Sequence, residues 1–311
     1  MLLAGRYSIE GRIGQGGMAR VYGARDVETE RRVAVKILEP EHFHRPGGVE
    51  LFLREAAAAQ RVRHPNIVET IAVGTRPDGR PYIVMELLEG ETLGEYLERE
   101  GNMPLDRALF LLTEVAAGLA AANAAGVVHR DVTPHNLFLV GPVGSPFGAK
   151  LLDFGLAETE SHIDESTAGH AVGTMQYMAP EQVLDDGVTT ATDVYGFGVV
   201  LFRALTGALP FDGYDEVLVL AHQVWSKPPP PSWLVESLPP GLDSIVCAAL
   251  RKRPENRYES LDDLRRDLLR VCDAPHVNIE TLPMRYDHDA YVPRSKEAAR
   301  AAEFLKRQLD K

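Results

Sequence analysis

The sequence HRDVTPHN, residues 129–136, gathers charged and amide side chains into one short segment. Pro134 has no backbone N–H and disfavours a helical conformation at Thr133, so the segment is predicted to be a loop. Asp131 and Asn136 both carry side-chain oxygens, but aspartate and asparagine are also common turn formers. Taken alone, the segment fits a polar turn as well as a catalytic loop.

The sequence just downstream adds a third oxygen-bearing side chain. Residues 136–140 (NLFLV) and 149–154 (AKLLDF) are apolar runs that predict two short strands. Asp153 lies in the second run, so Asp131, Asn136 and Asp153 would bracket one hairpin. Carboxylate and amide oxygens suit Mg²⁺, which also takes substrate phosphates as ligands. The alternative is that each residue only forms a turn.

A glycine-rich segment lies near the N-terminus, at residues 13–22 (IGQGGMARVY). Gly14 and Gly16, followed by Ala19 and Val21, predict a tight turn between two strands. Glycines there allow backbone amides to approach a phosphate closely. A glycine-rich hairpin without a ligand explains the same residues. A dinucleotide-binding turn fits less well, because a strand rather than a helix follows.

Lys36 ends the strand-like segment VAVK. Alternation places this lysine on the same face as a small alanine, which leaves room for a planar ligand. The predicted helix at residues 49–62 offers Glu55 as an ion-pair partner for Lys36. Alternatively, Lys36 is a solvated surface residue. Glu55 would then pair with Arg54 or Arg61 on the helix surface.

The secondary-structure signals change near residue 90. Before it, alternating apolar residues predict a small antiparallel sheet with one helix. The expected elements are strands within 7–38, a loop at 41–48, the helix at 49–62, and strands at 66–74 and 81–89.

After residue 90 helical patterns predominate, and no internal repeat is visible. The predicted features are helices at 90–100 and 104–126, a long loop at 156–180, a helix opening with 192–198, a proline-rich break at 227–233 and a final helix at 296–311. That final helix carries one apolar stripe, made of Ala298, Ala302, Leu305 and Leu309.

The composition is that of a soluble globular chain of 311 residues, with 45% apolar and 25% charged residues. A formal net charge of −12 argues against nucleic acid or an anionic membrane as partner. The two cysteines, Cys247 and Cys272, exclude a disulfide framework and fit a reducing, cytoplasmic compartment. No signal peptide or membrane segment of about 18 apolar residues is visible.

Two further motifs, MAPE at residues 178–181 and TDVYGFG at 192–198, complete an ordered series. Glycine loop, strand lysine, helix glutamate, HRD with its asparagine, DFG and APE follow one another over residues 7–272. In this order the chain resembles the protein kinases, and most closely the bacterial Ser/Thr kinases of eukaryotic type.

The resemblance implies an α+β, bilobal protein kinase fold. Its N-lobe, residues 1–88, would hold a five-stranded antiparallel sheet with helix C, and its mainly helical C-lobe would span residues 89–273. Residues 274–311 would form a C-terminal extension with the final helix. That helix is expected to pack on its own domain, although pairing with a partner and leading into a membrane anchor were the alternatives.

By the same resemblance, ATP with Mg²⁺ would bind between the lobes. Lys36, held by Glu55, would grip the α and β phosphates, and Asp131 would orient the substrate hydroxyl and accept its proton. Asn136 and Asp153 would hold the metal. The residues assigned to the nucleotide are Ile13, Gly14, Gln15, Gly16, Gly17, Met18, Ala19, Arg20, Val21, Ala34, Lys36, Met85, Glu86, Leu88 and Phe138.

Other family positions are assigned structural or regulatory roles. The implied bracing residues are Glu181 with Arg257 as an ion pair, Asp193 as anchor of the catalytic loop, and Phe154 with His129 in an internal spine. Arg130 implies control by a phosphate on the activation loop, with Ser166 and Thr167 as expected acceptors. Thr174 belongs to the substrate-binding segment.

The activation loop is already acidic, through Glu158, Glu160, Asp164 and Glu165. We hypothesise that these carboxylates partly satisfy Arg130 and weaken control by phosphate.

Thr133 departs from the Ser/Thr kinase pattern, in which a lysine two residues after the catalytic aspartate neutralises the γ-phosphate. Losing one preorganised charge in an active site costs a factor on the order of 10²–10³ in rate. His135 occupies the position where tyrosine kinases carry arginine, and it could supply a charge. The sequence is therefore interpreted as a Ser/Thr kinase with an altered catalytic loop.

Two other functions are compatible with parts of the sequence. A pseudokinase that binds ATP and signals as a scaffold is supported only by Thr133. A small-molecule phosphotransferase is disfavoured by the complete segment through MAPE and by Arg257. The expected partners are protein substrates, and a transient homodimer would serve autophosphorylation in trans.

Overall fold

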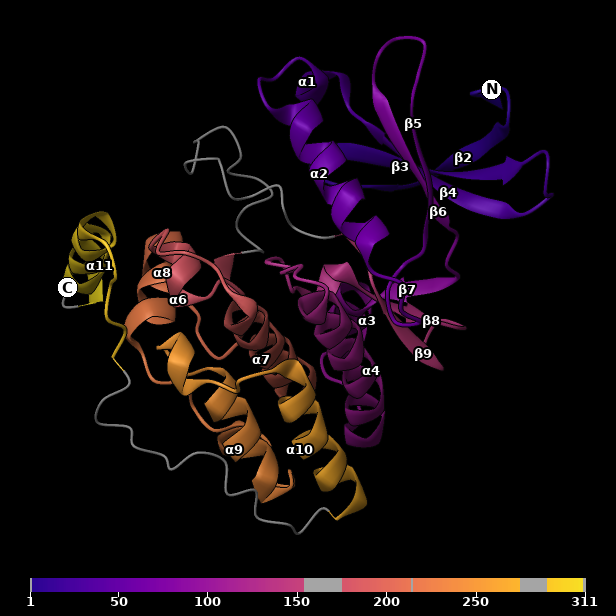
Figure 1. Ribbon diagram of the computed structural model, residues 1–311. Coiled ribbons are helices and arrows are strands. Elements are labelled where there is room, and N and C mark those ends of the chain that lie inside the picture. The colour runs from indigo at the N-terminus through magenta and orange to yellow at the C-terminus, as the bar shows by residue number, and fades with distance from the viewer. Residues whose placement is uncertain (1, 154–174, 214, 275–289, 310–311) are drawn as a thin grey trace.

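The computed structural model describes residues 2–153, 175–213, 215–274 and 290–309. A β-sheet with one long helix forms the N-terminal part, and a larger helical part lies beside it (Figure 1). Within the described ranges, no helix has the length and apolar character needed to cross a membrane.

The N-terminal sheet has six antiparallel strands in the order β1-β2-β3-β4-β6-β5. Their bounds are β1 Leu2–Leu3, β2 Tyr7–Gln15, β3 Ala19–Asp26, β4 Arg32–Leu38, β5 Thr70–Thr75 and β6 Pro81–Glu86. The prediction of five strands was wrong by one, because β1 pairs with the start of β2. Ala4 (φ 52°) and Gly5 (φ 70°) form the connecting turn, and left-handed conformations at both central residues match the twist of a hairpin.

Alternation along the strands gives this sheet two different faces. One face carries Val33 and Val35 in a small outer cluster. The opposite face carries Ala19 and Leu38, which pack against Phe52 of helix α2, Gly48–Arg61. A short helix, α1, Pro40–Phe43, precedes α2 where a loop was expected, and a proline in its first turn suits a helix start.

A second, three-stranded sheet joins the two parts, in the order β7 Gly90–Thr92, β8 Leu137–Val140 and β9 Gly148–Leu151. The predicted helix at 90–100 was therefore wrong in its first turn. Gly90 has φ 146°, and a Cβ there would lie 2.0 Å from the Leu139 carbonyl oxygen, so only glycine fits. Helix α3, Leu93–Glu100, begins after Thr92, whose hydroxyl caps it in a capping box with Glu95.

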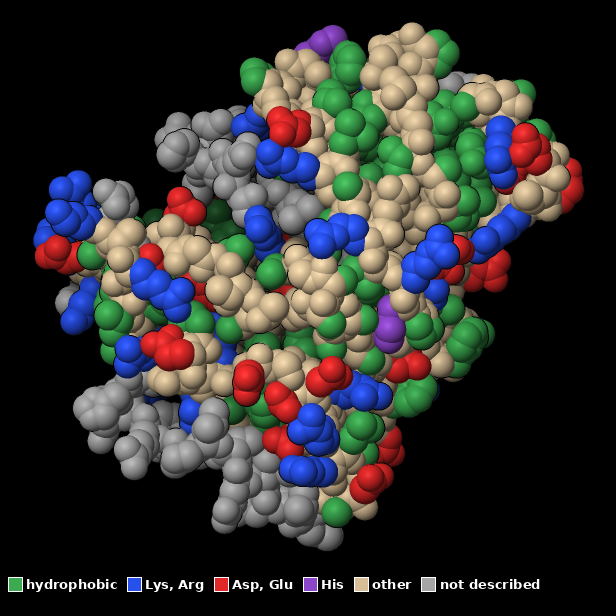
Figure 2. Space-filling view, in the orientation of Figure 1, with side chains coloured by type: hydrophobic (Ala, Val, Ile, Leu, Met, Phe, Trp, Pro, Cys, Tyr) green, Lys and Arg blue, Asp and Glu red, His purple; other side chains and the backbone are tan. Residues whose placement is uncertain are grey.

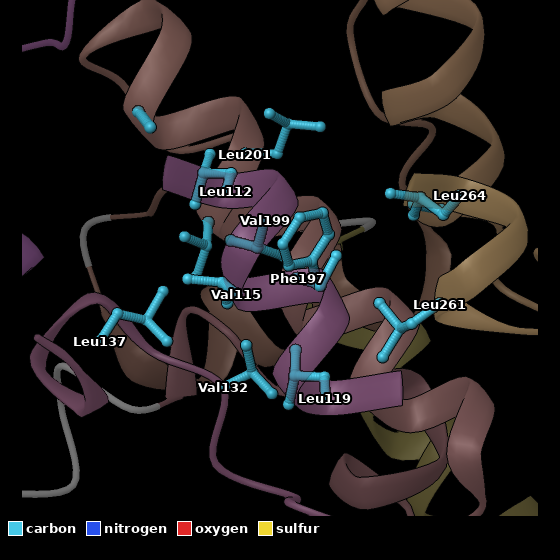
Figure 3. Packing of buried hydrophobic residues seen from close by; sticks show 14 of the residues in the cluster. Leu112, Val115, Leu119, Val132, Leu137, Phe197, Val199, Leu201, Leu261 and Leu264 are labelled. Atoms are coloured by element: carbon cyan, nitrogen blue, oxygen red, sulfur yellow. The ribbon is translucent and has the colours of Figure 1, made fainter. Parts of the chain in front are cut away.

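Helices α3, α4, α7, α9 and α10 contribute side chains to one large apolar core in the C-terminal part, and Figure 3 shows some of these residues. The helices that follow α3 are α4 Leu105–Ala124, α6 Pro180–Val183, α7 Thr190–Thr206, α8 Glu216–Trp225, α9 Pro240–Ala249, α10 Leu261–Asp273 and α11 Lys296–Leu309, with 3-10 turns η1 Pro134–Asn136, η4 Pro231–Trp233 and η5 Pro254–Asn256. Helix α7 is buried on nearly all sides, as expected for a helix that is apolar all round. It therefore forms the centre of this part.

The C-terminal helix packs on its own domain, as predicted. Ala302 and Leu305 of α11 are buried against Leu220 and Val224 of α8. The proline-rich break at 227–233 separates α8 from α9. The division of the chain at residues 88 and 273 stays a prediction.

We expect Phe197→Ala to lower the free energy of unfolding by about 3 to 5 kcal/mol, because truncating a buried phenylalanine leaves a cavity. Phe197 is 0% exposed on α7, whereas Phe110 on α4 is 49% exposed. Phe110→Ala is the matched control and should change the free energy by about 0.5 kcal/mol or less. Chemical denaturation measures both, and equal effects would contradict the assignment of α7 as the centre of the core.

Candidate active site

Three charged side chains from separate segments meet between the two parts of the molecule. Lys36 Nζ lies 2.7 Å from Glu55 Oε1 on α2 and 2.6 Å from Asp153 Oδ2 beyond β9. Strand β4 pairs Lys36 with Val21 on one side and Ile83 on the other, which points its side chain toward α2. The predicted ion pair of Lys36 with Glu55 is confirmed.

Burial and charge compete at this cluster. Burial would lower the pKa of Lys36, but attraction to Asp153 and Glu55 outweighs it and raises that pKa above its usual value. Burial raises the pKa of Glu55 to about 7, against the opposing effect of Lys36. Burial would also raise the pKa of Asp153, but Lys36 holds it below its usual value. The lysine is therefore a fixed cation with Asp153 as its anionic partner.

The alternative pairing of Glu55 on the helix surface is wrong. Arg54 contacts Glu50 at 2.7 Å, one turn earlier on α2. Arg61 donates a hydrogen bond of 2.9 Å to the carbonyl oxygen of Ala125. Both arginines lie outside the Lys36 cluster.

The catalytic loop predicted at 129–136 is held from beneath by Asp193 of α7. Its carboxylate accepts hydrogen bonds from the backbone N–H groups of His129 (2.9 Å) and Arg130 (2.8 Å). Asn123 of α4 donates a third, at 2.8 Å. The predicted anchoring by Asp193 is confirmed, and burial raises the pKa of this carboxyl to about 6 despite the three donors.

Arg130 adopts a left-handed backbone conformation, with φ 70°. Such a conformation costs energy for a residue other than glycine and persists only where the surroundings hold it. The Arg130 N–H is bound by Asp193, and its carbonyl oxygen accepts a hydrogen bond of 2.8 Å from Gln182 of α6. The strained conformation is thus fixed from two elements.

Asp131 and Asn136 face each other across the loop. Asn136 Nδ2 donates to Asp131 Oδ2 at 2.6 Å and to its carbonyl oxygen at 2.9 Å. Asp131 Oδ1 is buried and has no hydrogen-bond partner among the described residues. Burial raises the pKa of Asp131, although Asn136 opposes the shift. An acceptor oxygen is therefore available to a hydroxyl proton.

The donor set fits Mg²⁺. Because Asn136 uses its amide nitrogen on Asp131, its carboxamide oxygen is left as a ligand, and Asp153 adds a carboxylate. No three His, Cys, Asp or Glu side chains gather into a metal site in the part of the chain that is described. The Asp153 carboxylate and the Asn136 amide oxygen suit Mg²⁺, which takes one or two carboxylates and completes its shell with phosphates and water.

Thr133 is buried, whereas His135 is exposed. Thr133 is 5% exposed and accepts a hydrogen bond of 3.0 Å from Asn136 N at its carbonyl oxygen. The His135 ring lies against α3, where a Cβ at Gly94 would meet Nδ1 at 2.4 Å. Its Nε2 is 3.9 Å from a carboxylate oxygen of Glu98. Assistance by His135 stays a prediction.

The glycine loop lies on the face of the sheet that carries Lys36. Gly16 N–H donates to the Ala19 carbonyl oxygen at 2.9 Å, which closes the turn between β2 and β3. Ile13 lies over Gly23, since a Cβ atom added at Gly23 would be 3.4 Å from Ile13 Cγ2. Ala34 is paired with both Gly23 and Met85. Ile13, Ala34 and Met85 thus share one face, as the nucleotide assignment requires.

The side chain of Glu86, at the end of β6, is bound on both sides. Its Oε1 contacts Lys150 Nζ of β9 at 2.5 Å and accepts from Glu69 N–H at 2.8 Å. Phe138 projects from β8 toward Gly90, because a Cβ there would meet its Cε1 at 3.1 Å. The assignment of Glu86, Leu88 and Phe138 to the nucleotide stays a prediction.

The predicted brace between Glu181 and Arg257 is confirmed. Arg257 donates to both carboxylate oxygens of Glu181, at 2.7 and 2.8 Å, and the two side chains are 1% or less exposed. Thr192 donates a further hydrogen bond to Glu181. The pair joins α6 to η5, next to the loop that carries Asp131.

Several predicted residues lie outside the described ranges: Phe154, Glu158, Glu160, Asp164, Glu165, Ser166, Thr167 and Thr174. Two residues that hold the catalytic loop, Asn123 and Gln182, were missed by sequence reasoning. An amide side chain in a helix gives no local signal of a hydrogen bond to a backbone 52 residues away, as Gln182 makes to Arg130.

A paired lysine and glutamate lie beneath a glycine loop, and an aspartate–asparagine pair lies opposite them. The chain matches the protein kinase domain over residues 7–267. It is 34% identical to serine/threonine-protein kinase PrkC of Bacillus subtilis over 304 residues, which cover 96% of this chain and 46% of PrkC.

Two further comparisons agree. Serine/threonine-protein kinase Pkn1 of Myxococcus xanthus is 39% identical over 287 residues, which cover 90% of this chain and 40% of Pkn1. The solved kinase domain of PknI from Mycobacterium tuberculosis has a TM-score of 0.68 and 26% identity, covering 87% of this chain and 96% of that one. The chain belongs to the protein kinase family. It spans less than half the length of the two curated relatives.

We expect His129 to make the folded state sensitive to acid. Burial lowers the pKa of His129 to about 4, whereas a free histidine titrates near pH 6.5. Between these pH values the unfolded state therefore binds more protons than the folded state. As pH falls from about 6.5 to about 4, the free energy of unfolding falls by up to about 3 kcal/mol because of His129.

His129→Phe should make the fall in unfolding free energy across this range shallower than in the wild type. Denaturant titrations at about pH 7, 6, 5 and 4 measure the difference between the two proteins. A constant difference at all four values would contradict the prediction.

Proposed function

We propose that this chain transfers the γ-phosphate of ATP to serine or threonine hydroxyls of proteins. The observation that carries the proposal is the Lys36 ammonium held between Glu55 and Asp153, facing a loop in which one oxygen of Asp131 has no hydrogen-bond partner among the described residues. Phosphoryl transfer mainly requires positioned groups and neutralised charge, and these residues supply both.

Bound ATP with Mg²⁺ would supply the phosphoryl group and neutralise its developing charge. Lys36 would bind phosphate oxygens, since its ammonium is permanently charged. Asn136 and Asp153 would hold the metal through oxygen atoms. Asp131 Oδ1 would accept the hydroxyl proton, and Asn136 keeps that carboxylate oriented through its amide.

The choice of serine and threonine rests on the relatives and on the segment at 175–181. The curated relatives PrkC and Pkn1 are named serine/threonine-protein kinases. Thr133 alone suggested a scaffold without activity, and the comparisons give that alternative no support. Protein substrates are favoured over small molecules by the brace between Glu181 and Arg257, which supports the substrate segment.

Regulation through Arg130 is a further part of the proposal. Its Nε is buried and lacks a hydrogen-bond partner among the described residues. A phosphate on Ser166 or Thr167 would give it an anion, and the acidic residues around them would compete. Autophosphorylation in a transient homodimer would install that phosphate. The proposal also places the chain in the cytoplasm, where ATP is available. It includes no nucleic acid as a partner.

Asp131→Asn should abolish phosphotransfer, with a loss of about 10²-fold or more, because the carboxamide cannot accept the proton. Incubation with radiolabelled ATP and mass spectrometry of the phosphosites measure activity and residue type together. ATP with Mg²⁺ should still raise the melting temperature of the variant. A wild type that ATP stabilises but that labels neither itself nor a generic substrate would refute the kinase proposal and leave the scaffold.

Thr133→Lys should raise kcat for protein phosphorylation, by about 10-fold or more, since one added active-site charge is worth on the order of 10²–10³. The KM for ATP should change little. Steady-state kinetics at saturating ATP measure the effect, and Thr133→Met is a control that adds length without charge. No gain with lysine would show that the catalytic loop supplies this charge in another way.

A further inference from the structure

A second apolar cluster lies apart from the main core, and we call it the C-terminal cluster. Its buried members come from four parts of the chain: Met175, Leu184, Leu220, Ala221, Val224, Tyr291, Ala302 and Leu305. Met175 directly follows the substrate-segment residue Thr174 and is 4% exposed. The final helix and the substrate segment therefore share one hydrophobic contact region.

Helix α11 is fixed on α8 by more than apolar contact. Trp225 Nε1, at the end of α8, donates a hydrogen bond of 3.2 Å to the carbonyl oxygen of Ala302. The Lys306 ammonium lies 5.4 Å from the centre of the Trp225 ring, within the range of a cation–π contact. Charged side chains cover the outer side of α11 (Figure 2, left edge), so the helix has one buried and one solvated side.

The residues before α11 make a second attachment, on the loop after α6. Tyr291 is 3% exposed, and its hydroxyl donates to Asp186 Oδ2 at 2.7 Å. The backbone N–H of Arg294 donates to the same oxygen at 2.6 Å. The C-terminal segment therefore spans from α8 to the α6–α7 loop, the two elements on either side of residues 175–178.

Helix α8 itself holds the substrate segment by a buried side chain. Gln223 is 0% exposed, and its Nε2 donates to the Gln176 carbonyl oxygen at 2.5 Å. Tyr195 of α7 donates to Gln223 Oε1 at 2.5 Å. Lys252 donates to the Tyr195 hydroxyl at 3.1 Å and to the Gln223 carbonyl oxygen at 2.7 Å. A shift of α8 would thus move the Gln176 backbone.

From these contacts we propose that residues 290–309 are a positioning element for the protein substrate. They lie beyond the matched kinase domain, which ends at residue 267. They tie α8 and the α6–α7 loop together, and so keep Met175 buried and the Gln223–Gln176 hydrogen bond in place. The substrate part of this inference rests on the proposed kinase function, whereas the bracing of residues 175–184 does not.

The test uses variants of the whole 311-residue chain that differ by one position on α11. Leu305→Glu places a charge in the C-terminal cluster, and Phe304→Glu makes the same change at a site that is 57% exposed. Leu305→Met keeps an apolar side chain of similar volume and should behave as wild type. None of these residues belongs to the catalytic cluster.

Hydrogen exchange of a peptide covering residues 175–184 is the first measurement. Leu305→Glu should accelerate it by about 10-fold or more, because local opening becomes easier, while β4 exchanges as before. The other two variants should leave both peptides unchanged. Unchanged exchange at 175–184, or acceleration that extends equally to β4, would overturn the bracing.

The second measurement is steady-state kinetics with a peptide that the wild-type protein phosphorylates. Leu305→Glu should raise the KM for the peptide by about 10-fold and change the KM for ATP by less than about 2-fold. An equal rise in the KM for the peptide and in the KM for ATP would overturn the positioning role. If the wild type transfers no phosphate, the proposed function fails, and hydrogen exchange still decides whether α11 braces residues 175–184.

Discussion

The buried ammonium of Lys36 is the charge on which the arrangement of the two lobes depends. Removing a charge from water costs several kcal/mol unless partners compensate it, on the order of the stability of a whole domain. Glu55 and Asp153 provide that compensation from a helix of the N-terminal part and from the end of β9. The pairing therefore requires β4, α2 and the second sheet to meet at one point, which is also the point where phosphates would bind.

The C-terminal part solves a different problem, which is to hold an irregular loop in a fixed conformation. Asp193 binds two successive backbone N–H groups, and Gln182 binds the carbonyl oxygen of Arg130. Both residues lie on helices that the large core or the buried pair of Glu181 and Arg257 keeps in place. The strained loop is thus supported by rigid neighbours, which fix the positions of Asp131 and Asn136.

The C-terminal segment extends this support beyond the kinase domain. Its apolar side closes a cluster that would otherwise leave Met175, Leu220 and Val224 exposed to water. Exposed contiguous apolar surface is unfavourable in a soluble domain, which explains why the helix stays docked. Because Gln223 joins α8 to the backbone of Gln176, stability on the outer flank is coupled to the geometry of the substrate segment.

The order of the motifs, the alternation that turns Lys36 toward α2 and the amphipathic stripe of α11 can all be recognised in the residues alone. These features depend on neighbours a few residues away, so local spacing reveals them. The folded arrangement was needed to show that Leu2–Leu3 forms a sixth strand, that Gly90–Thr92 is a strand, and that Gln182 and Gln223 hold distant backbone groups. Apart from β1, which pairs with the adjoining start of β2, these contacts join residues far apart in the chain, and their energy appears only when folding brings both partners together.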